Sequence, residues 1–183
     1  MTISEEFYFS REPARLTLET ANEIFIHCVK QGASDVTLQT DEPIYAEIYG
    51  RLCRITHRRL SNTEIGDILN GIYGPNGTTQ LMSGKDVDTH HEIRPSRGER
   101  YRFRINATAC LVEGHDGIQI TARTIPTDPP TLESMALPKP IVEAITPEQG
   151  VVYVTGATGS GKSTLLSSII RSIAEDPESH RKI

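Results

Sequence analysis

Hydrophobic residues recur along the first half of the chain at spacings that predict two amphipathic helices. Over residues 17–29 the apolar side chains form a single helical stripe, and Gly32 follows at the position where a helix commonly ends. A second stripe follows Ser61-Asn62-Thr63-Glu64, which has the form of a capping box, and the turn residues 74–77 end it. Each helix is therefore predicted to place one face against a core.

The segments between and after these helices alternate apolar and polar residues with a period of two, which is typical of half-buried strands. The predicted strands are residues 34–39, a hairpin of 44–49 and 52–56, an extended stretch at 88–94, and a pair at 100–108 and 117–124. Helices among antiparallel strands predict an α+β domain over residues 17–124, preceded by a flexible lead-in of residues 1–16.

Prolines then mark a change of organisation. Residues 125–140 hold a proline-rich linker with one expected helical turn, and residues 141–145 are expected to form a short helix. The apolar run 151–154 predicts a buried strand, and helical spacing resumes from Lys162 to about residue 174. Residues 141–183 are therefore predicted to begin an α/β domain.

The loop between that strand and that helix matches the phosphate-binding pattern G-x-x-x-x-G-K-[ST]. Its glycines allow backbone N–H groups to point at an anion, and the helix N-terminus adds partial positive charge at the same place. Lys162 can reach the β- and γ-phosphates of ATP, and the Ser163 hydroxyl can ligate Mg²⁺. The predicted nucleotide-binding residues are Gly156, Ala157, Thr158, Gly159, Ser160, Gly161, Lys162, Ser163 and Thr164.

Composition and length indicate which kind of protein carries this site. The 183 residues carry a net charge of −5, so direct nucleic-acid binding is not expected. Three widely spaced cysteines indicate reduced thiols in a cytosolic protein, and neither a signal peptide nor an apolar run of about 20 residues occurs. The polypeptide ends 20 residues after Ser163, whereas a complete motor domain needs about 100–200 residues. We therefore expect a truncated ATPase that lacks turnover by itself.

Four motifs in order resemble those of the PilT-type secretion ATPases. Residues 32–38, GASDVTL, are similar to their "ASD-hydrophobic-H-L" signature, with Thr37 standing where the family usually has His. Residues 100–106, RYRFRIN, resemble the "RFRVN" strand, and residues 123–126, RTIP, resemble the "R-x-I-P" segment. The loop from Gly156 is their Walker A motif. Within the superfamily, residues 11–17 and 60–62 are most similar to the DotB-type ATPases of type IVB secretion and the related TraJ-type conjugation ATPases.

The resemblance implies a homo-hexameric, ATP- and Mg²⁺-dependent ATPase on the cytoplasmic face of the inner membrane, working on a secretion or conjugation apparatus. Each subunit would have a PAS-like N-terminal domain and a RecA-like motor, with nucleotide bound between them. It also implies that Arg104 and Arg123, with Lys162, act on the nucleotide phosphates. From the strand pattern alone, Arg100, Arg102 and Arg104 could equally form a solvated face, and for Arg102 that interpretation is kept.

Other functions remain as alternatives. A pilus-retraction motor would share the same motifs, and the chain by itself could be a non-catalytic oligomerisation or docking module. A small-molecule kinase would use the same loop but needs an acceptor pocket and a lid after it. His90 and His91 could suggest a metal site with Asp86 and Asp88, but adjacent residues of a strand point to opposite faces and chelate poorly. Asp35 is interpreted as a turn-capping residue.

Overall fold

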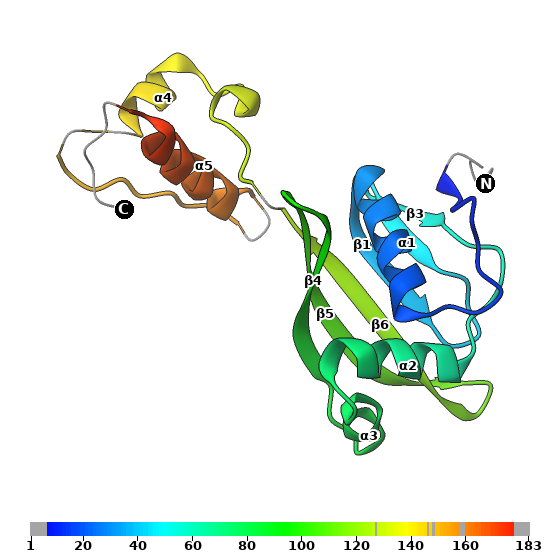
Figure 1. Ribbon diagram of the computed structural model, residues 1–183. Coiled ribbons are helices and arrows are strands. Elements are labelled where there is room, and N and C mark those ends of the chain that lie inside the picture. Colours follow the sequence, from blue (N-terminus) through cyan, green and yellow to red (C-terminus); the bar gives the residue numbers. More distant parts are fainter. Residues whose placement is uncertain (1–6, 127, 146, 148, 158–159, 178–183) are drawn as a thin grey trace. The chain divides into compact units, whose positions relative to one another are not determined.

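The chain divides into two compact units, residues 1–127 and 128–183, each with its own hydrophobic cluster. The computed structural model describes residues 7–126, 128–145, 147, 149–157 and 160–177 (Figure 1). No described helix is both long and apolar enough to cross a lipid bilayer.

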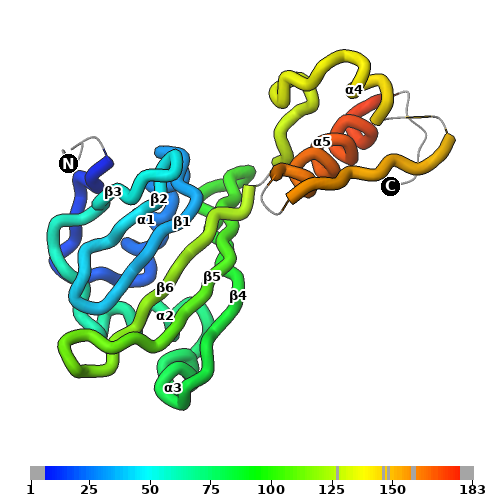
Figure 2. Tube along the Cα trace, turned by 180° about the vertical axis from the view of Figure 1, so that it is seen from behind, coloured from blue at the N-terminus to red at the C-terminus, as the bar shows by residue number. Residues whose placement is uncertain are grey.

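The N-terminal unit is built on a six-stranded sheet in the order β3-β2-β1-β6-β5-β4, in which every neighbouring pair is antiparallel (Figure 2). This arrangement confirms the predicted α+β class with an antiparallel sheet. β5 and β6 form the longest pair, and β5 extends beyond the predicted end at residue 108 because its alternation continues to residue 112. The strands are β1 (Ala33–Gln39), β2 (Tyr45–Ile48), β3 (Arg51–Arg54), β4 (Val87–Ser96), β5 (Glu99–Val112) and β6 (His115–Ile125).

Two helices, α1 (Leu18–Lys30) and α2 (Asn62–Tyr73), cover one face of this sheet, and no helix of residues 7–126 lies on the opposite face (Figures 1 and 2). Thr17 and Ser61 cap them, and each takes part in a capping box as N-cap residue. The short helix α3 (Gly77–Met82) follows α2. One face of the sheet is therefore buried and the other is left for polar side chains.

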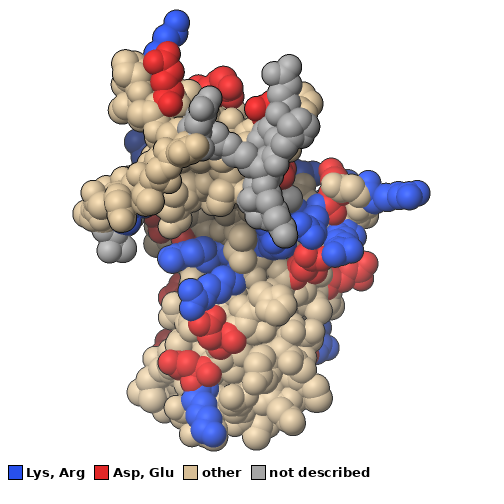
Figure 3. Space-filling model, turned by 90° about the vertical axis from the view of Figure 1, so that its left-hand side faces the viewer, with Lys and Arg blue, Asp and Glu red and all other residues tan. Residues whose placement is uncertain are grey.

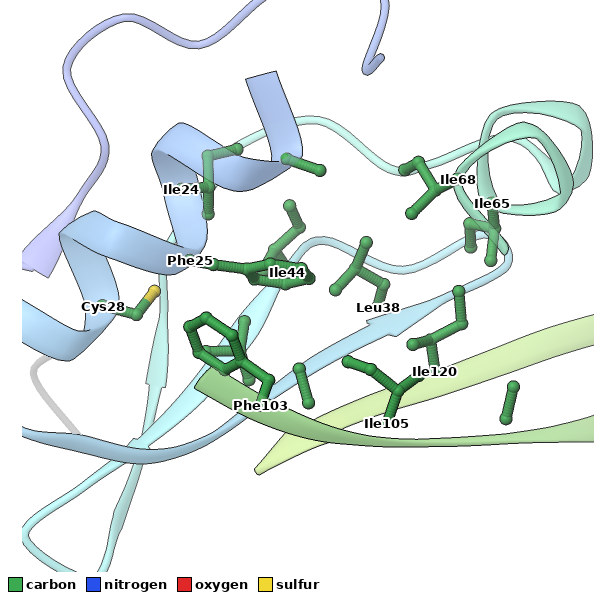
Figure 4. Close-up of a cluster of buried hydrophobic side chains, with 14 of the residues drawn as sticks. Ile24, Phe25, Cys28, Leu38, Ile44, Ile65, Ile68, Phe103, Ile105 and Ile120 are labelled. Atoms are coloured by element: carbon green, nitrogen blue, oxygen red, sulfur yellow. The ribbon is translucent and has the colours of Figure 1, made fainter. Parts of the chain in front are cut away.

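The buried face forms a continuous core of helix and strand side chains (Figure 4). Phe25 of α1 and Phe103 of β5 lie at its centre with ring centroids 5.3 Å apart, and neither is accessible to solvent. Cys28 is also fully buried, as the helical stripe predicted, and burial raises the pKa of its thiol to about 12. The residue acts as a small apolar side chain rather than as a reactive thiol.

Gly32, which follows α1, is required for two reasons. Its φ is +82°, a conformation that L-residues rarely adopt, and a Cβ at this position would lie 2.9 Å from the hydroxyl oxygen of Tyr49. Glycine thus allows the chain to turn from α1 into β1 next to Tyr49, which lies in the turn between β2 and β3.

Residues 8–16 have no helix or strand but are joined to the unit by hydrogen bonds. The Phe9 amide donates to the Ile55 carbonyl at 2.9 Å, and the Glu12 carboxylate accepts from the amides of His57 and Arg58. Leu16 at the end of this segment is buried, and its amide donates to Glu64 of α2 at 2.6 Å. The segment before α1 therefore contributes contacts to the core.

The C-terminal unit holds a 3₁₀ turn η2 (Glu133–Met135), α4 (Lys139–Ala144) and α5 (Lys162–Glu175). The expected helices are present, and Leu132, Ile145 and Ile169 form the small buried cluster. The predicted buried strand at 151–154 is not formed: Val151 and Tyr153 are 74% and 85% exposed and have no strand geometry. Among the described residues no strand pairs with this run, so its backbone groups find no ladder partner.

Candidate functional site

The loop that is predicted to bind phosphate leads directly into α5. Gly161 is the N-cap with φ +85°, and no side chain of the described residues caps the helix start, so the first-turn N–H groups of α5 can donate to an exogenous acceptor. Lys162 and Ser163 open the helix, and the Lys162 ammonium donates to the Ala157 carbonyl at 2.6 Å. The lysine side chain thus folds back over the loop rather than out into solvent.

Gly156 shows that the loop is too tight for a larger residue. Its φ is +154°, and a Cβ there would lie 2.8 Å from the Ser160 hydroxyl and 4.0 Å from Cδ of Lys162. A loop that needs glycine where backbone and lysine approach fits a bound triphosphate. Thr158 and Gly159 of the predicted site lie outside the described residues. The remaining predicted positions, including Ala157 and Thr164, are described and fall on the loop or the first turn of α5.

The second set of predicted residues lies on the helix-free face of the N-terminal sheet. Arg104 of β5 is directly opposite Arg123 of β6, and Arg123 is directly opposite Asp35 of β1. Arg104 Nε donates to Asp88 Oδ1 at 3.1 Å and its Nη2 donates to Oδ2, while Arg123 Nε donates to Asp35 Oδ1 at 2.8 Å. The interpretation of Asp35 as a turn cap is wrong, because the residue lies within β1 and is ion-paired there.

Asp35, Arg104 and Arg123 line a shallow hollow of about 320 Å³ together with Asn106 and Thr121. Both arginine side chains are about 70% exposed, so they remain accessible to a ligand. The hydrogen bonds from Arg104 lower the pKa of Asp88, and the same contact raises the pKa of Arg104. Across the view in Figure 3, basic and acidic side chains lie beside one another rather than in separate patches.

The neighbouring basic residues behave differently. Arg102 is half-buried, its Nε has no hydrogen-bond partner among the described residues, and its Nη2 donates weakly to the Pro126 carbonyl at 3.5 Å. It is therefore not the fully solvated side chain that the alternation favoured. Within the described residues no group of three His, Cys, Asp or Glu side chains could hold a metal ion, and His91 instead contacts Asn22 of α1 at 2.7 Å.

Sequence reasoning did not identify Asp88 as the partner of Arg104. Asp88 lies opposite Asn106, so it is diagonal to Arg104 across the β4–β5 pair, a separation that long side chains can span. The sequence offered one signal: Asp88 lies on the strand directly before the strand that carries Arg104, and consecutive strands often pair as a hairpin. That signal depends on the register, which the spacing of residues 88–94 alone does not define.

Comparison with known proteins places the chain in a family. The model for the type II/IV secretion system protein family matches residues 85–183. The chain is similar to the ATPase DotB of Legionella pneumophila, with 63% identity, a TM-score of 0.88 and coverage of 94% of this chain and 47% of that one. It is also similar to DotB of Yersinia pseudotuberculosis, with 32% identity, a TM-score of 0.79 and coverage of 91% and 45%.

Among curated relatives, the type IV pilus retractation ATPase PilT of Pseudomonas aeruginosa is 28% identical over 148 residues, which are 81% of this chain and 41% of PilT. The chain thus spans less than half the length of each of these three relatives. The family model covers more than half of the chain, and the solved relatives carry the same fold. The chain therefore belongs to the family of type II/IV secretion system proteins, and within that family it is similar to the PilT-like, DotB-type secretion ATPases.

Proposed function

We propose that this chain is the N-terminal part of a hexameric ATPase that powers type IVB secretion or conjugative transfer. The observation that carries the proposal is the 63% identity to DotB over 94% of the chain, with a complete phosphate-binding motif inside the family match over residues 85–183. In this proposal residues 17–124 are a PAS-like domain, residues 125–140 are a linker, and residues 141–183 begin a RecA-like motor. The hexamer acts on an apparatus at the cytoplasmic face of the inner membrane.

The loop and α5 bind the nucleotide. Backbone N–H groups of residues 156–161 and of the first helical turn donate to phosphate oxygens, and Gly156 keeps that cradle open. Lys162 exchanges the Ala157 carbonyl for the β- and γ-phosphates, because a phosphate is a stronger acceptor for an ammonium than a carbonyl oxygen is. Bound Mg²⁺, held by Ser163, supplies charge neutralisation at the phosphates.

The reaction is in-line attack of water on the γ-phosphate, with positioning and charge stabilisation as the contribution of the protein. Arg104 and Arg123 supply positive charge from the N-terminal unit to the phosphoryl group that is transferred. Their location on adjacent strands of a rigid sheet keeps the two guanidinium groups close together. The linker allows the N-terminal domain to move relative to the motor.

A pilus-retraction motor is the second candidate, and the relation to PilT over 81% of the chain supports it. The two candidates share ATP hydrolysis and differ in the apparatus that the hexamer drives. Deletion of the gene separates them: loss of effector or plasmid transfer supports secretion or conjugation, whereas loss of surface motility supports retraction.

The biochemical test compares Lys162→Ala with Lys139→Ala in the complete protein. Lys139 is an exposed residue at the start of α4 and serves as the control. We expect Lys162→Ala to lose nucleotide binding, measured by titration calorimetry, and phosphate release, whereas Lys139→Ala keeps both. Undiminished ATP binding and turnover in Lys162→Ala would refute a nucleotide site in this loop.

A further inference from the structure

Both arginines of the hollow are held by the same edge of the guanidinium group. Asp88 contacts Arg104 through Nε and Nη2, and Asp35 contacts Arg123 through Nε. Among residues 7–126, Nη1 of Arg104 and both Nη atoms of Arg123 donate no hydrogen bond. The terminal end of each guanidinium, which presents two donors side by side, is therefore available to a ligand.

The strand register makes this arrangement costly without the carboxylates. Arg104 and Arg123 are direct cross-strand neighbours, and like charges at such positions destabilise a sheet. The simplest interpretation of Asp88 is that it only neutralises the charge of Arg104. An exposed ion pair of this kind adds little to stability, and neutralisation by itself would not orient Arg104 toward a ligand.

The two-point contact has a further consequence. A side chain that is 67% exposed otherwise samples many rotamers, and a carboxylate that accepts from both Nε and Nη2 fixes the plane of the guanidinium. Groups fixed in advance of the transition state need not be ordered when it forms. The hollow then presents the free end of Arg104 next to that of Arg123.

We propose that Asp88 is a positioning residue for Arg104: it grips the Nε–Nη2 edge so that the terminal Nη1–Nη2 end meets two oxygens of the transferred phosphoryl group. This inference rests on the proposed function and adds Asp88 to it. Asp88 itself does not contact the nucleotide.

The test is a double-mutant cycle in the complete ATPase: Asp88→Asn, Arg104→Ala and both together, with kcat and KM for ATP measured. Asn keeps the size of Asp88 but has one acceptor oxygen and no charge. We expect kcat of Asp88→Asn to fall about tenfold with KM changed less than about threefold, since misplacement of a catalytic group by 1 Å costs up to about a hundredfold. In the Arg104→Ala background the same change should have no further effect.

Glu92→Gln is the matched control. Glu92 lies on the same strand and is ion-paired with Arg94 and Arg100, neither of which lines the hollow. We expect its kcat to equal that of the wild type, and Asp88→Glu, which restores charge and two oxygens, to recover part of the loss. Thermal unfolding of all variants checks that they fold alike.

Four outcomes would overturn the inference. If Arg104→Ala lowers kcat about a thousandfold while Asp88→Asn is unchanged, Arg104 acts without positioning and the proposed function stands. A rise in kcat for Asp88→Asn would show that the carboxylate competes with the phosphate for Arg104. If Asp88→Asn also lowers kcat tenfold in the Arg104→Ala background, the substitution acts through folding or assembly and not through Arg104. If Arg104→Ala itself has wild-type kcat, the role of Arg104 in the proposed function fails, and this inference fails with it.

Discussion

The N-terminal and C-terminal units differ in how far their own residues complete a core. In the N-terminal unit, two capped helices cover one face of a sheet in which every strand has a partner, and residues such as Phe25 and Phe103 are fully buried. In the described C-terminal unit, α5 packs on a small cluster around Ile169, and the apolar run at 151–154 is exposed. The comparison teaches that a correct local motif is not sufficient for a strand, because a strand also needs a neighbour.

The two units also carry different kinds of functional group. The C-terminal unit offers backbone N–H groups and a lysine on a glycine-rich loop, which suits binding of a triphosphate. The N-terminal unit offers arginines on rigid strands, held by carboxylates, which suits stabilisation of charge during reaction. We therefore expect substitutions in the two units to have different kinetic signatures.

The largest expected effect is the difference between variants of the two units in kcat and in affinity for ATP. Arg104→Ala or Arg123→Ala in the complete protein should lower kcat about 10³–10⁵-fold, the range for an arginine that acts at the transition state of phosphoryl transfer, with a small change in ATP affinity. Lys162→Ala should weaken affinity as well. Arg104→Lys should rescue poorly, because an ammonium lacks the planar two-donor end.

Steady-state ATPase assays with light scattering to confirm assembly measure this difference. Arg94→Ala, at an exposed position near the end of β4, is the control and should be unaffected. If the arginine variants assemble and hydrolyse ATP within a few-fold of wild type, both arginines are ordinary residues of a solvated face.

The second prediction compares the two cores. Phe103→Ala should reduce the free energy of unfolding of the N-terminal unit by about 3–5 kcal/mol, because it removes a fully buried ring in contact with Phe25. Ile170→Ala on α5 should change the free energy of unfolding of the C-terminal unit by less than about 0.5 kcal/mol, since this side chain is 50% exposed. Urea denaturation followed by circular dichroism measures both, and similar losses for the two variants would contradict the contrast between the cores.

The third prediction uses pH and applies to the N-terminal unit. Glu64 is buried, which by itself raises its pKa, but hydrogen bonds from Arg58, the Leu16 amide and Ser61 outweigh burial and lower the pKa to about 2 from 4.5. A lowered pKa stabilises the folded state fully above pH 4.5, and this stabilisation is lost as the pH falls towards 2. The contribution at neutral pH is about 3 kcal/mol.

Glu64→Gln should therefore lower stability at pH 7 by roughly that amount and remove this part of the pH dependence between pH 4.5 and 2. Asp67→Asn, on the same helix, is the control. Asp67 forms an exposed ion pair with Arg15 and should shift stability by less than about 1 kcal/mol. The measurement is denaturation at a series of pH values; equal pH profiles for Glu64→Gln and wild type would exclude Glu64 as the source.

The smallest expected effect concerns local opening of the two units. In dilute solution the amides of β5 and β6 should exchange on the order of a hundredfold more slowly than those of α5, because strand pairing and the core protect the former. Hydrogen exchange followed by mass spectrometry resolves the two regions. Equal protection of residues 162–175 and 101–124 would show that the C-terminal unit is as stable as the sheet.

Several features could be predicted because their causes lie within a few residues of the chain. Thr17 was identified as a helix start from the apolar stripe that follows it, and Ser61 from its capping box, which involves only the next three residues. The alternation around Phe103 predicted both the strand and its buried face. The loop before Lys162 was recognised because a phosphate-binding motif is contiguous in sequence.

The tertiary structure alone decided which of these elements are neighbours. The order of the strands brings Asp35 beside Arg123 across 88 residues, and the register of β4 on β5 brings Asp88 to Arg104. Neither contact has a local signature, because a shift of register by one residue would turn every side chain to the other face without changing the sequence pattern. The run at 151–154 has the composition of a strand, yet its backbone groups find no partner among the described residues. Sequence determined what each segment prefers to be, and pairing between distant segments decided whether that preference is realised.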